Sequence, residues 1–153
     1  MKKYWPLLAL ILVAALAALA LCVGTSNPNW MHFFMGIFLC QFAMLKIFHL
    51  QGFADGFQMY DLIAVKSRSY AYIYPFIELT LGLCYLAFVI PTAVYIITIL
   101  ILGTGAVGVI KALIQGLDVR CACMGTVLDV PLSTVTLTED LGMVAMALTL
   151  LLT

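Results

Sequence analysis

The first long stretch of the chain, residues 4–23, is apolar and contains no charged side chain. A helix of about 20 such residues matches the hydrocarbon thickness of a bilayer. Two lysines precede the stretch, as they do in a signal peptide. However, the run is longer than the apolar core of a signal peptide, and Leu19 to Cys22 make a poor processing site. The stretch therefore predicts a retained transmembrane helix.

The composition extends this prediction to the whole chain. Of its 153 residues, 65% are hydrophobic and only 9% are charged, whereas soluble domains have about 45–50% apolar and about 25% charged residues. The mean hydropathy is +1.18. Seven Lys and Arg balance seven Asp and Glu, so no excess positive charge is available to bind nucleic acid. The sequence predicts an all-α integral membrane protein that contacts the lipid bilayer.

Three further apolar segments are long enough to cross a membrane, namely residues 30–50, 70–90 and 92–114. A last helix of about 17 residues is expected to begin at Thr136, because Thr136 and Glu139 have the spacing of a capping box. Residues 1–29 are thus expected to form an N-terminal transmembrane helix and a short loop. Residues 30–153 are expected to form a four-helix transmembrane bundle.

The segments between these spans lead to two more expectations. Residues 51–69 carry aromatic side chains at helical spacing, which predicts an amphipathic helix on the membrane surface. Gly108 and Ala112 have the small-xxx-small spacing that lets membrane helices pack closely. We therefore expect residues 70–90 and 92–114 to form a tight hairpin.

The basic residues predict an orientation, because Lys and Arg are retained on the cytoplasmic side of short loops. In a five-span arrangement all of them fall on the side of the N-terminus: Lys2, Lys3, Lys46, Lys66, Arg68, Lys111 and Arg120. We therefore expect a multi-pass protein of the bacterial cytoplasmic (inner) membrane, with its N-terminus inside and its C-terminus outside.

The most distinctive motif is Cys121-Ala122-Cys123, two thiols one residue apart in the longest polar connection. Such a pair can close a strained, exchangeable disulfide, or it can bind a soft metal ion such as Cu(I), Hg(II) or Zn(II). Arg120 beside the pair would lower the pKa of a thiol and favour either use. Cysteines also pack as small apolar residues. Because this pair lies in a polar loop, a functional role is favoured, but the motif does not choose between redox chemistry and metal binding.

Lys46 and Glu78 each lie inside an apolar span. An isolated charge there costs about 2.5–3.5 kcal/mol on insertion scales, so the two side chains should be partners. They are close to the same end of their spans, at depths that a lysine side chain can bridge. A structural ion pair and a proton-handling or substrate-binding role both remain open.

Residues 30–50 also carry side chains that bind soft metals. A metal pathway would use the loop residues as an entry or exit site and the helix residues as inner ligands, in all Cys121, Cys123, Met124, Cys40, Met44 and His49. Methionines and aromatic residues at helical spacing more often pack in a core, and packing is the first interpretation for the helix residues.

The order of several landmarks resembles that of the MauE branch of the MauE/DoxX redox-associated membrane protein family. In chain order these landmarks are Lys46, Phe53, Tyr60, Pro75, Glu78, Gly82, Cys121-Ala122-Cys123-Met124-Gly125 and Ser133. The resemblance covers about residues 30–150. The chain departs from the family's Cys-Gly-Cys-Phe-Gly-like motif at Ala122 and Met124, and the second change adds a soft ligand beside the thiols.

The resemblance implies a four-helix core associated with making or maintaining disulfides in partner proteins. It implies that Cys121 and Cys123 are the exchanging pair and that Lys46 and Glu78 hold the helix core. The expected partner is a thioredoxin-like redox protein or a metal-binding domain.

The leading hypothesis is a membrane protein for thiol–disulfide exchange or redox maturation, with the activity of a thiol–disulfide oxidoreductase left open. The alternative is a transporter or transfer protein for copper or mercury that uses the same thiols, and a third reading is a structural subunit. Disulfides of bacterial exported proteins form outside the cytoplasm, whereas the basic residues place Cys121 and Cys123 inside. Electrons from a cytoplasmic reductant, metal delivery to the cytoplasm, or loss of the first span would each resolve this conflict.

Overall fold

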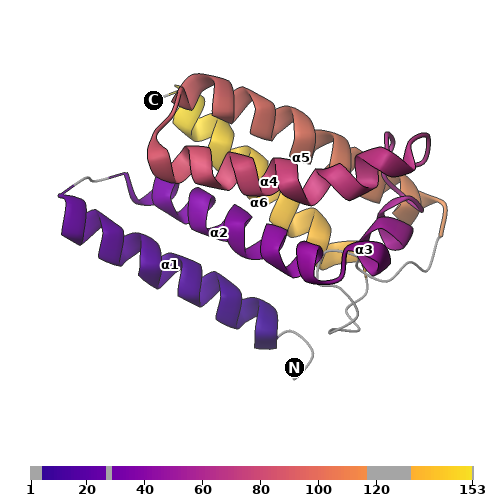
Figure 1. The fold of residues 1–153 in the computed structure, drawn as a ribbon, viewed down its shortest axis with the longest axis horizontal. Helices are drawn as coiled ribbons and strands as arrows, with labels where there is room; N and C mark the ends of the chain where they lie inside the picture. The colour runs from indigo at the N-terminus through magenta and orange to yellow at the C-terminus, as the bar shows by residue number, and fades with distance from the viewer. Residues whose placement is uncertain (1–4, 27–28, 117–131, 153) are drawn as a thin grey trace.

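A computed structural model describes residues 5–26, 29–116 and 132–152 and shows helices without strands in these ranges (Figure 1). The helices are α1 (Trp5–Thr25), α2 (Trp30–Phe48), α3 (Leu50–Phe57), α4 (Arg68–Ala87), α5 (Pro91–Ile114) and α6 (Leu132–Leu152). The predicted all-α fold is confirmed. Four helices in the described ranges, α1, α2, α4 and α5, are long and apolar enough to cross a membrane. The protein is therefore a multi-pass membrane protein.

The last helix is longer than the sequence predicted. It begins at Leu132 and has 21 residues, which is also enough to span a bilayer. The predicted start at Thr136 is wrong, and Glu139 lies in the second turn of α6. A capping-box spacing marks a helix start only when no helical turn precedes it, and here one does.

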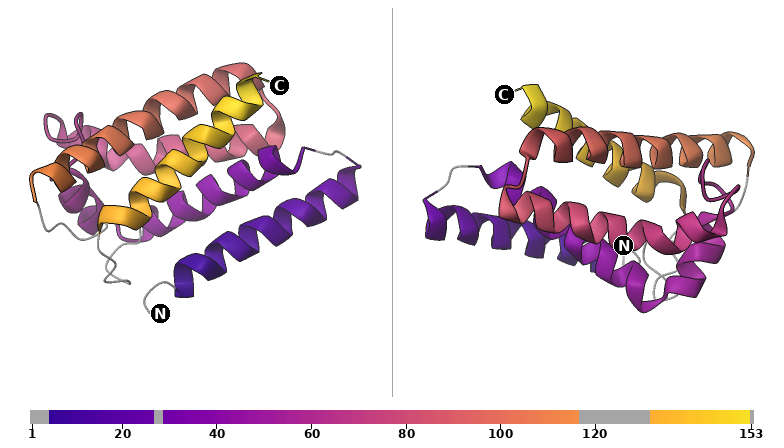
Figure 2. Two further views of the ribbon diagram at one scale, coloured as in Figure 1. Left: turned by 180° about the vertical axis from the view of Figure 1, so that it is seen from behind. Right: turned by 45° about the horizontal axis from the view of Figure 1, so that its top comes forward.

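The bundle consists of two closely packed helix pairs, α2 with α4 and α5 with α6. Thinner contacts between α4 and α5, and between α2 and α6, join the pairs. The two views in Figure 2 show α1 outside the bundle, alongside α2. Its small residues Ala14 and Ala18 are fully buried, which lets the two helices approach closely. Leu8, Leu12 and Leu16 are exposed, as expected for a face turned to lipid.

Glycines bring α2 and α4 together backbone to backbone. A Cβ atom at Gly82 would lie 2.9 Å from the carbonyl oxygen of Gly36 and 2.7 Å from the Sγ atom of Cys40. A Cβ atom at Gly36 would lie 3.0 Å from the carbonyl oxygen of Gly82. Because a side chain at either position would meet backbone atoms, this crossing requires glycine on both helices.

The sequence predicted that residues 92–114 pack tightly against residues 70–90, and this prediction is wrong. The segment that packs tightly against these small residues is a different one. A Cβ atom at Gly108 would lie 2.6 Å from the carbonyl oxygen of Tyr60, so α5 makes this close approach to the segment after α3. Among the helices, α5 packs most extensively against α6. Small residues allow a close approach without specifying which segment makes it.

The predicted amphipathic helix is present as α3, but it ends at Phe57 and its apolar side packs against protein. Phe57 lies 4.5 Å from Tyr74 of α4 between ring centroids, and Phe53 lies 6.0 Å from the same ring. Tyr60 and Ala64, beyond the helix, are also buried. The segment therefore closes one end of the bundle.

The basic side chains of the described ranges gather at this same end. Lys46 lies in the last turn of α2, Lys111 in the last turn of α5, and Lys66 and Arg68 at the start of α4. Lys2, Lys3 and Arg120 lie outside the described residues. We call this the basic end of the bundle.

Candidate functional site

The centre of the candidate site is the contact between Lys46 and Glu78. The Nζ atom of Lys46 lies 2.5 Å from a carboxylate oxygen of Glu78, and the two residues are 4% and 3% exposed. Glu78 is about 15 Å along α4 from its start at Arg68, at 1.5 Å per residue. Helices α2 and α4 run in opposite directions, so the end of α2 that carries Lys46 lies beside the start of α4. The lysine side chain extends from there into the bundle and contacts the carboxylate of Glu78, so that each charge neutralises the other.

Two aromatic rings complete the surroundings of the lysine. The Nζ atom of Lys46 lies 5.5 Å from the ring centroid of Phe53 in α3 and 5.1 Å from that of Tyr74 in α4. Ring faces attract an ammonium group, and they do so more strongly when water is excluded. The closing segment of the bundle thus contributes one of the two rings beside the Lys46 ammonium group.

Helix α6 brings two acidic side chains to the same place. A small cavity of about 20 Å³ is lined by Lys46, Glu78, Glu139 and Asp140 together with apolar side chains. This volume is enough for about one water molecule. An Oδ atom of Asp140 also lies 3.6 Å from where a Cβ atom of Gly105 would be, so α5 forms part of the wall. The site therefore gathers four ionisable side chains from α2, α4 and α6.

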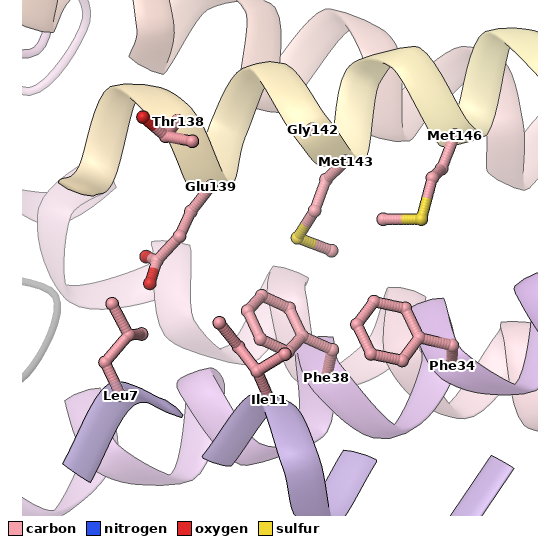
Figure 3. Close-up of a pocket in the computed structure, with 9 residues that line it drawn as sticks. All are labelled: Leu7, Ile11, Phe34, Phe38, Thr138, Glu139, Gly142, Met143 and Met146. Atoms are coloured by element: carbon pink, nitrogen blue, oxygen red, sulfur yellow. The ribbon is translucent and has the colours of Figure 1, made fainter. Parts of the chain in front are cut away.

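An apolar cleft adjoins this cavity. It has a volume of about 340 Å³, lies between α1, α2 and α6, and is lined mainly by apolar side chains (Figure 3). Figure 3 shows Met143 and Met146 of α6 facing Phe38 and Phe34 of α2, while Glu139 points toward α1. Phe38, Glu139 and Met143 line both the cleft and the cavity, so the wall between them consists of one carboxylate and two apolar side chains.

The family follows from a comparison with known proteins. Residues 25–153 match the family model described as methylamine utilisation protein MauE. The chain belongs to the MauE family. The match begins at the last residue of α1 and includes both the ionisable cluster and Cys121-Ala122-Cys123. No curated protein and no solved structure matches the chain.

The predicted exchanging pair, Cys121 and Cys123, lies in the part of the chain that the structure does not describe, as does Met124. The segment that carries them connects α5 to α6, and both helices have their adjoining ends at the basic end of the bundle. In the described ranges, Cys22, Cys40 and Cys84 are free thiols of intermediate exposure.

The structure brings together only two of the three predicted inner metal ligands, Cys40, Met44 and His49. Cys40 and Met44 of α2 line one groove of about 390 Å³, which α1 and α4 also help to form. His49 is exposed beyond the end of α2 and does not line this groove. Across the described residues, no three His, Cys, Asp or Glu side chains come together as a metal site would require.

A second buried polar cluster occupies the opposite end of the MauE bundle. His32 of α2 is 1% exposed, and its Nδ1 atom lies 2.9 Å from the hydroxyl oxygen of Tyr95 in α5. Its ring stacks on Phe88 with centroids 4.0 Å apart and lies 5.1 Å from the ring of Tyr85. The ring of His32 is thus packed among the aromatic side chains of Tyr85, Phe88 and Tyr95.

Sequence reasoning missed Glu139 and Asp140 as members of the site. The signal was available, because these are two adjacent acids in a final segment that is otherwise uncharged from residue 132 to 152. The capping-box spacing assigns Glu139 to the first turn of a helix, whereas Glu139 lies in the second turn of α6 and lines the cavity beside Lys46 and Glu78.

Proposed function

We propose that this MauE-family protein exchanges thiols and disulfides with a thioredoxin-like partner through Cys121 and Cys123, and so serves the redox maturation of partner proteins. The observation that carries the proposal is the presence of a Cys-x-Cys pair within the residues that match the family. The family's description connects its members with methylamine utilisation. The partner here is accordingly a protein whose disulfides must be made or kept for that kind of metabolism.

The proposed step is a two-electron exchange. A thiolate of Cys121 attacks a disulfide of the partner, forms a mixed disulfide and releases one partner thiolate, which takes up a proton. Cys123 then gives up its proton and attacks the mixed disulfide. The products are a disulfide between Cys121 and Cys123 and a reduced partner dithiol. The reverse sequence oxidises the partner, and the reduction potential of the partner decides the direction.

In this proposal Lys46 and Glu78 hold the helices of the bundle in register. Two observations support this role. Their contact joins α2 to α4, and the cavity beside it is closed by side chains of α6, the helix that follows the cysteine segment. The redox chemistry itself belongs to the thiols.

Trapping tests the proposal. The variant Cys123→Ser should accumulate a mixed disulfide between Cys121 and its partner, seen in cells as a band of higher mass that disappears on reduction. Cys84→Ser, which changes a thiol within α4, is the matched control and should trap nothing. If neither Cys123→Ser nor Cys121→Ser forms such a species, and the redox state of the pair never changes in cells, the proposal is wrong.

The second candidate function is transfer of a soft metal ion, copper or mercury, by the same thiols. The observation in its favour is that Cys40 and Met44 line one groove. Titration of the reduced protein with Cu(I) decides between the two functions. Binding that is lost in Cys121→Ser and weakened in Cys40→Ser supports metal transfer, whereas the absence of thiol-dependent binding rules it out.

A further inference from the structure

Another cavity, separate from the ionisable cluster, lies at the basic end of the bundle. It has a volume of about 460 Å³ and is formed between the segment that follows α3 and the last turns of α5. Its lining residues include both apolar and charged side chains: Met59, Tyr60, Asp61, Leu62, Val65, Lys66, Lys111, Ala112 and Gln115. The proposed thiol chemistry makes no use of this cavity.

Two lysines from different elements converge on the cavity. Lys66 comes from the segment before α4 and Lys111 from the last turn of α5, and the side-chain amide of Gln115 lies at the same end. Neither lysine forms an ion pair with another described residue. With the one carboxylate of Asp61, the lining carries a net charge of +1. The cavity is therefore suited to a ligand group with a single negative charge.

The floor of the cavity is held in place before any ligand arrives. Asp61 is fully buried, and one of its oxygens accepts hydrogen bonds from the backbone N–H groups of Ile63 and Ala64, at 2.9 and 2.8 Å. The carbonyl group of Tyr60 lies against Gly108 of α5, where a Cβ atom would be only 2.6 Å away. The segment that carries Lys66 is thus held against α5, the helix that carries Lys111.

The other carboxylate oxygen of Asp61 is buried and has no hydrogen-bond partner in the described part of the chain. A buried carboxylate oxygen without a donor is costly. A ligand that carries hydroxyl donors would supply what this oxygen lacks, either directly or through a water molecule.

The rim of the cavity is apolar. Met59 is 61% exposed and Val65 is 62% exposed, and both line the cavity beside Lys66. Exposed apolar side chains next to lysines, at the ends of membrane helices, are typical of the boundary between hydrocarbon and head groups. The surroundings thus suit a ligand with an anionic head and an apolar tail.

We propose that this cavity binds the phosphodiester head group of an anionic membrane lipid of the phosphatidylglycerol type. The phosphodiester carries one negative charge, which matches the net charge of the lining. Its oxygens accept hydrogen bonds from Lys66, Lys111 and Gln115, the glycerol hydroxyls supply donors, and the acyl chains leave over Met59 and Val65. Basic pockets between membrane helices bind lipid head groups in this way.

Lipid titration of the purified full-length protein in neutral detergent tests the proposal, with bound lipid counted by native mass spectrometry. The probes are phosphatidylglycerol and, as a lipid without net charge, phosphatidylcholine. Removing one lysine charge with Lys66→Gln or Lys111→Gln should weaken phosphatidylglycerol binding about fivefold, and the double variant about 25-fold. Binding of phosphatidylcholine should stay weak and unchanged.

Two controls separate a specific cavity from general surface charge. Arg68→Gln removes a positive charge at the same end, but Arg68 is paired with Asp55 at 2.8 Å and does not line the cavity, so binding should change less than twofold. The double variant Lys66→Arg/Lys111→Arg keeps both charges and should keep most of the binding.

Three results would overturn the proposal. The first is unchanged phosphatidylglycerol binding in the double Gln variant, whose folding is checked by its melting temperature. The second is an equal loss in Arg68→Gln. The third is displacement of the lipid by millimolar inorganic phosphate together with lysine-dependent binding of phosphate alone, because the site would then belong to a free phosphate ion.

Discussion

At the scale of single residues, the decisive feature is a lysine and a glutamate that satisfy each other inside a lipid-embedded bundle. Each charge alone would be costly at this depth. Together, with the rings of Phe53 and Tyr74 over the ammonium group, they form a compact neutral unit. Breaking a buried pair by removing one partner leaves an uncompensated charge, which is worse than having neither.

This reasoning gives a prediction for the pair. Lys46→Met and Glu78→Leu should each lower the free energy of unfolding by about 3–5 kcal/mol, whereas the double variant should lose much less than the sum. Unfolding in detergent micelles, followed by circular dichroism, measures the three values. The exposed pair of Arg68 and Asp55, each 60% exposed, is the control, and Arg68→Gln should leave the free energy of unfolding almost unchanged. Additive losses in the double variant would show that the two side chains do not act as a pair.

The sequence was sufficient to predict that Lys46 and Glu78 would need partners, since both lie in apolar spans at depths that one lysine side chain can bridge. It was not sufficient to place Glu139 and Asp140 beside them. Their position depends on where α6 begins. The helix begins at Leu132, four residues before the apparent cap at Thr136.

At the scale of helices, α2 and α4 approach each other backbone to backbone at Gly36 and Gly82. Interhelical packing in membranes has little hydrophobic driving force and depends on close contact. The two glycines let the backbones of α2 and α4 touch directly, and they therefore fix the distance between the two helices. The ion pair at one end and the contacts of His32 with α4 at the other keep this spacing along the whole length.

Gly82→Ala should therefore be destabilising by about 1–3 kcal/mol, because the added methyl group meets the Gly36 carbonyl at 2.9 Å and α4 must move away. The matched control is Gly103→Ala in α5, where a Cβ atom would have no neighbour within 4 Å. That substitution should be neutral, or stabilising by up to about 1 kcal/mol through higher helix propensity. Melting temperatures of the two variants in the same detergent provide the comparison. Equal effects would mean that the crossing tolerates a side chain.

Which segments form helices could be predicted from the sequence, but the pairing of the helices could not. Apolar length defines a span because the bilayer has a fixed thickness. It says little about neighbours, because lipid tails and apolar side chains offer a helix nearly the same environment. The expected hairpin of α4 with α5 is only a thin contact, while α5 packs along α6. The glycines that decide such contacts can be recognised only once the facing backbone is known.

At the scale of the whole molecule, the described basic residues lie at one end of the bundle, where short loops with Lys and Arg remain in the cytoplasm. We predict that this end faces the cytoplasm of a bacterial inner membrane. Ser67 at the basic end and Thr92 at the opposite end are both exposed and suit labelling. In a background without other cysteines, Thr92→Cys should react with a membrane-impermeant maleimide in intact cells, and Ser67→Cys only after permeabilisation. The reverse pattern would invert the orientation and move the cysteine segment outside.

The division of the bundle into two helix pairs also determines where the helices can most easily move apart. Packing is extensive within each pair and thin between α4 and α5 and between α2 and α6. A rigid-body movement would therefore part the pairs along their common seam and leave α2 clamped to α4. Lys46 and Glu78 would travel with one body, while Glu139 and Asp140 would travel with the other. The cavity lies on this seam, so any separation of the two pairs would change the distances between its ionisable groups.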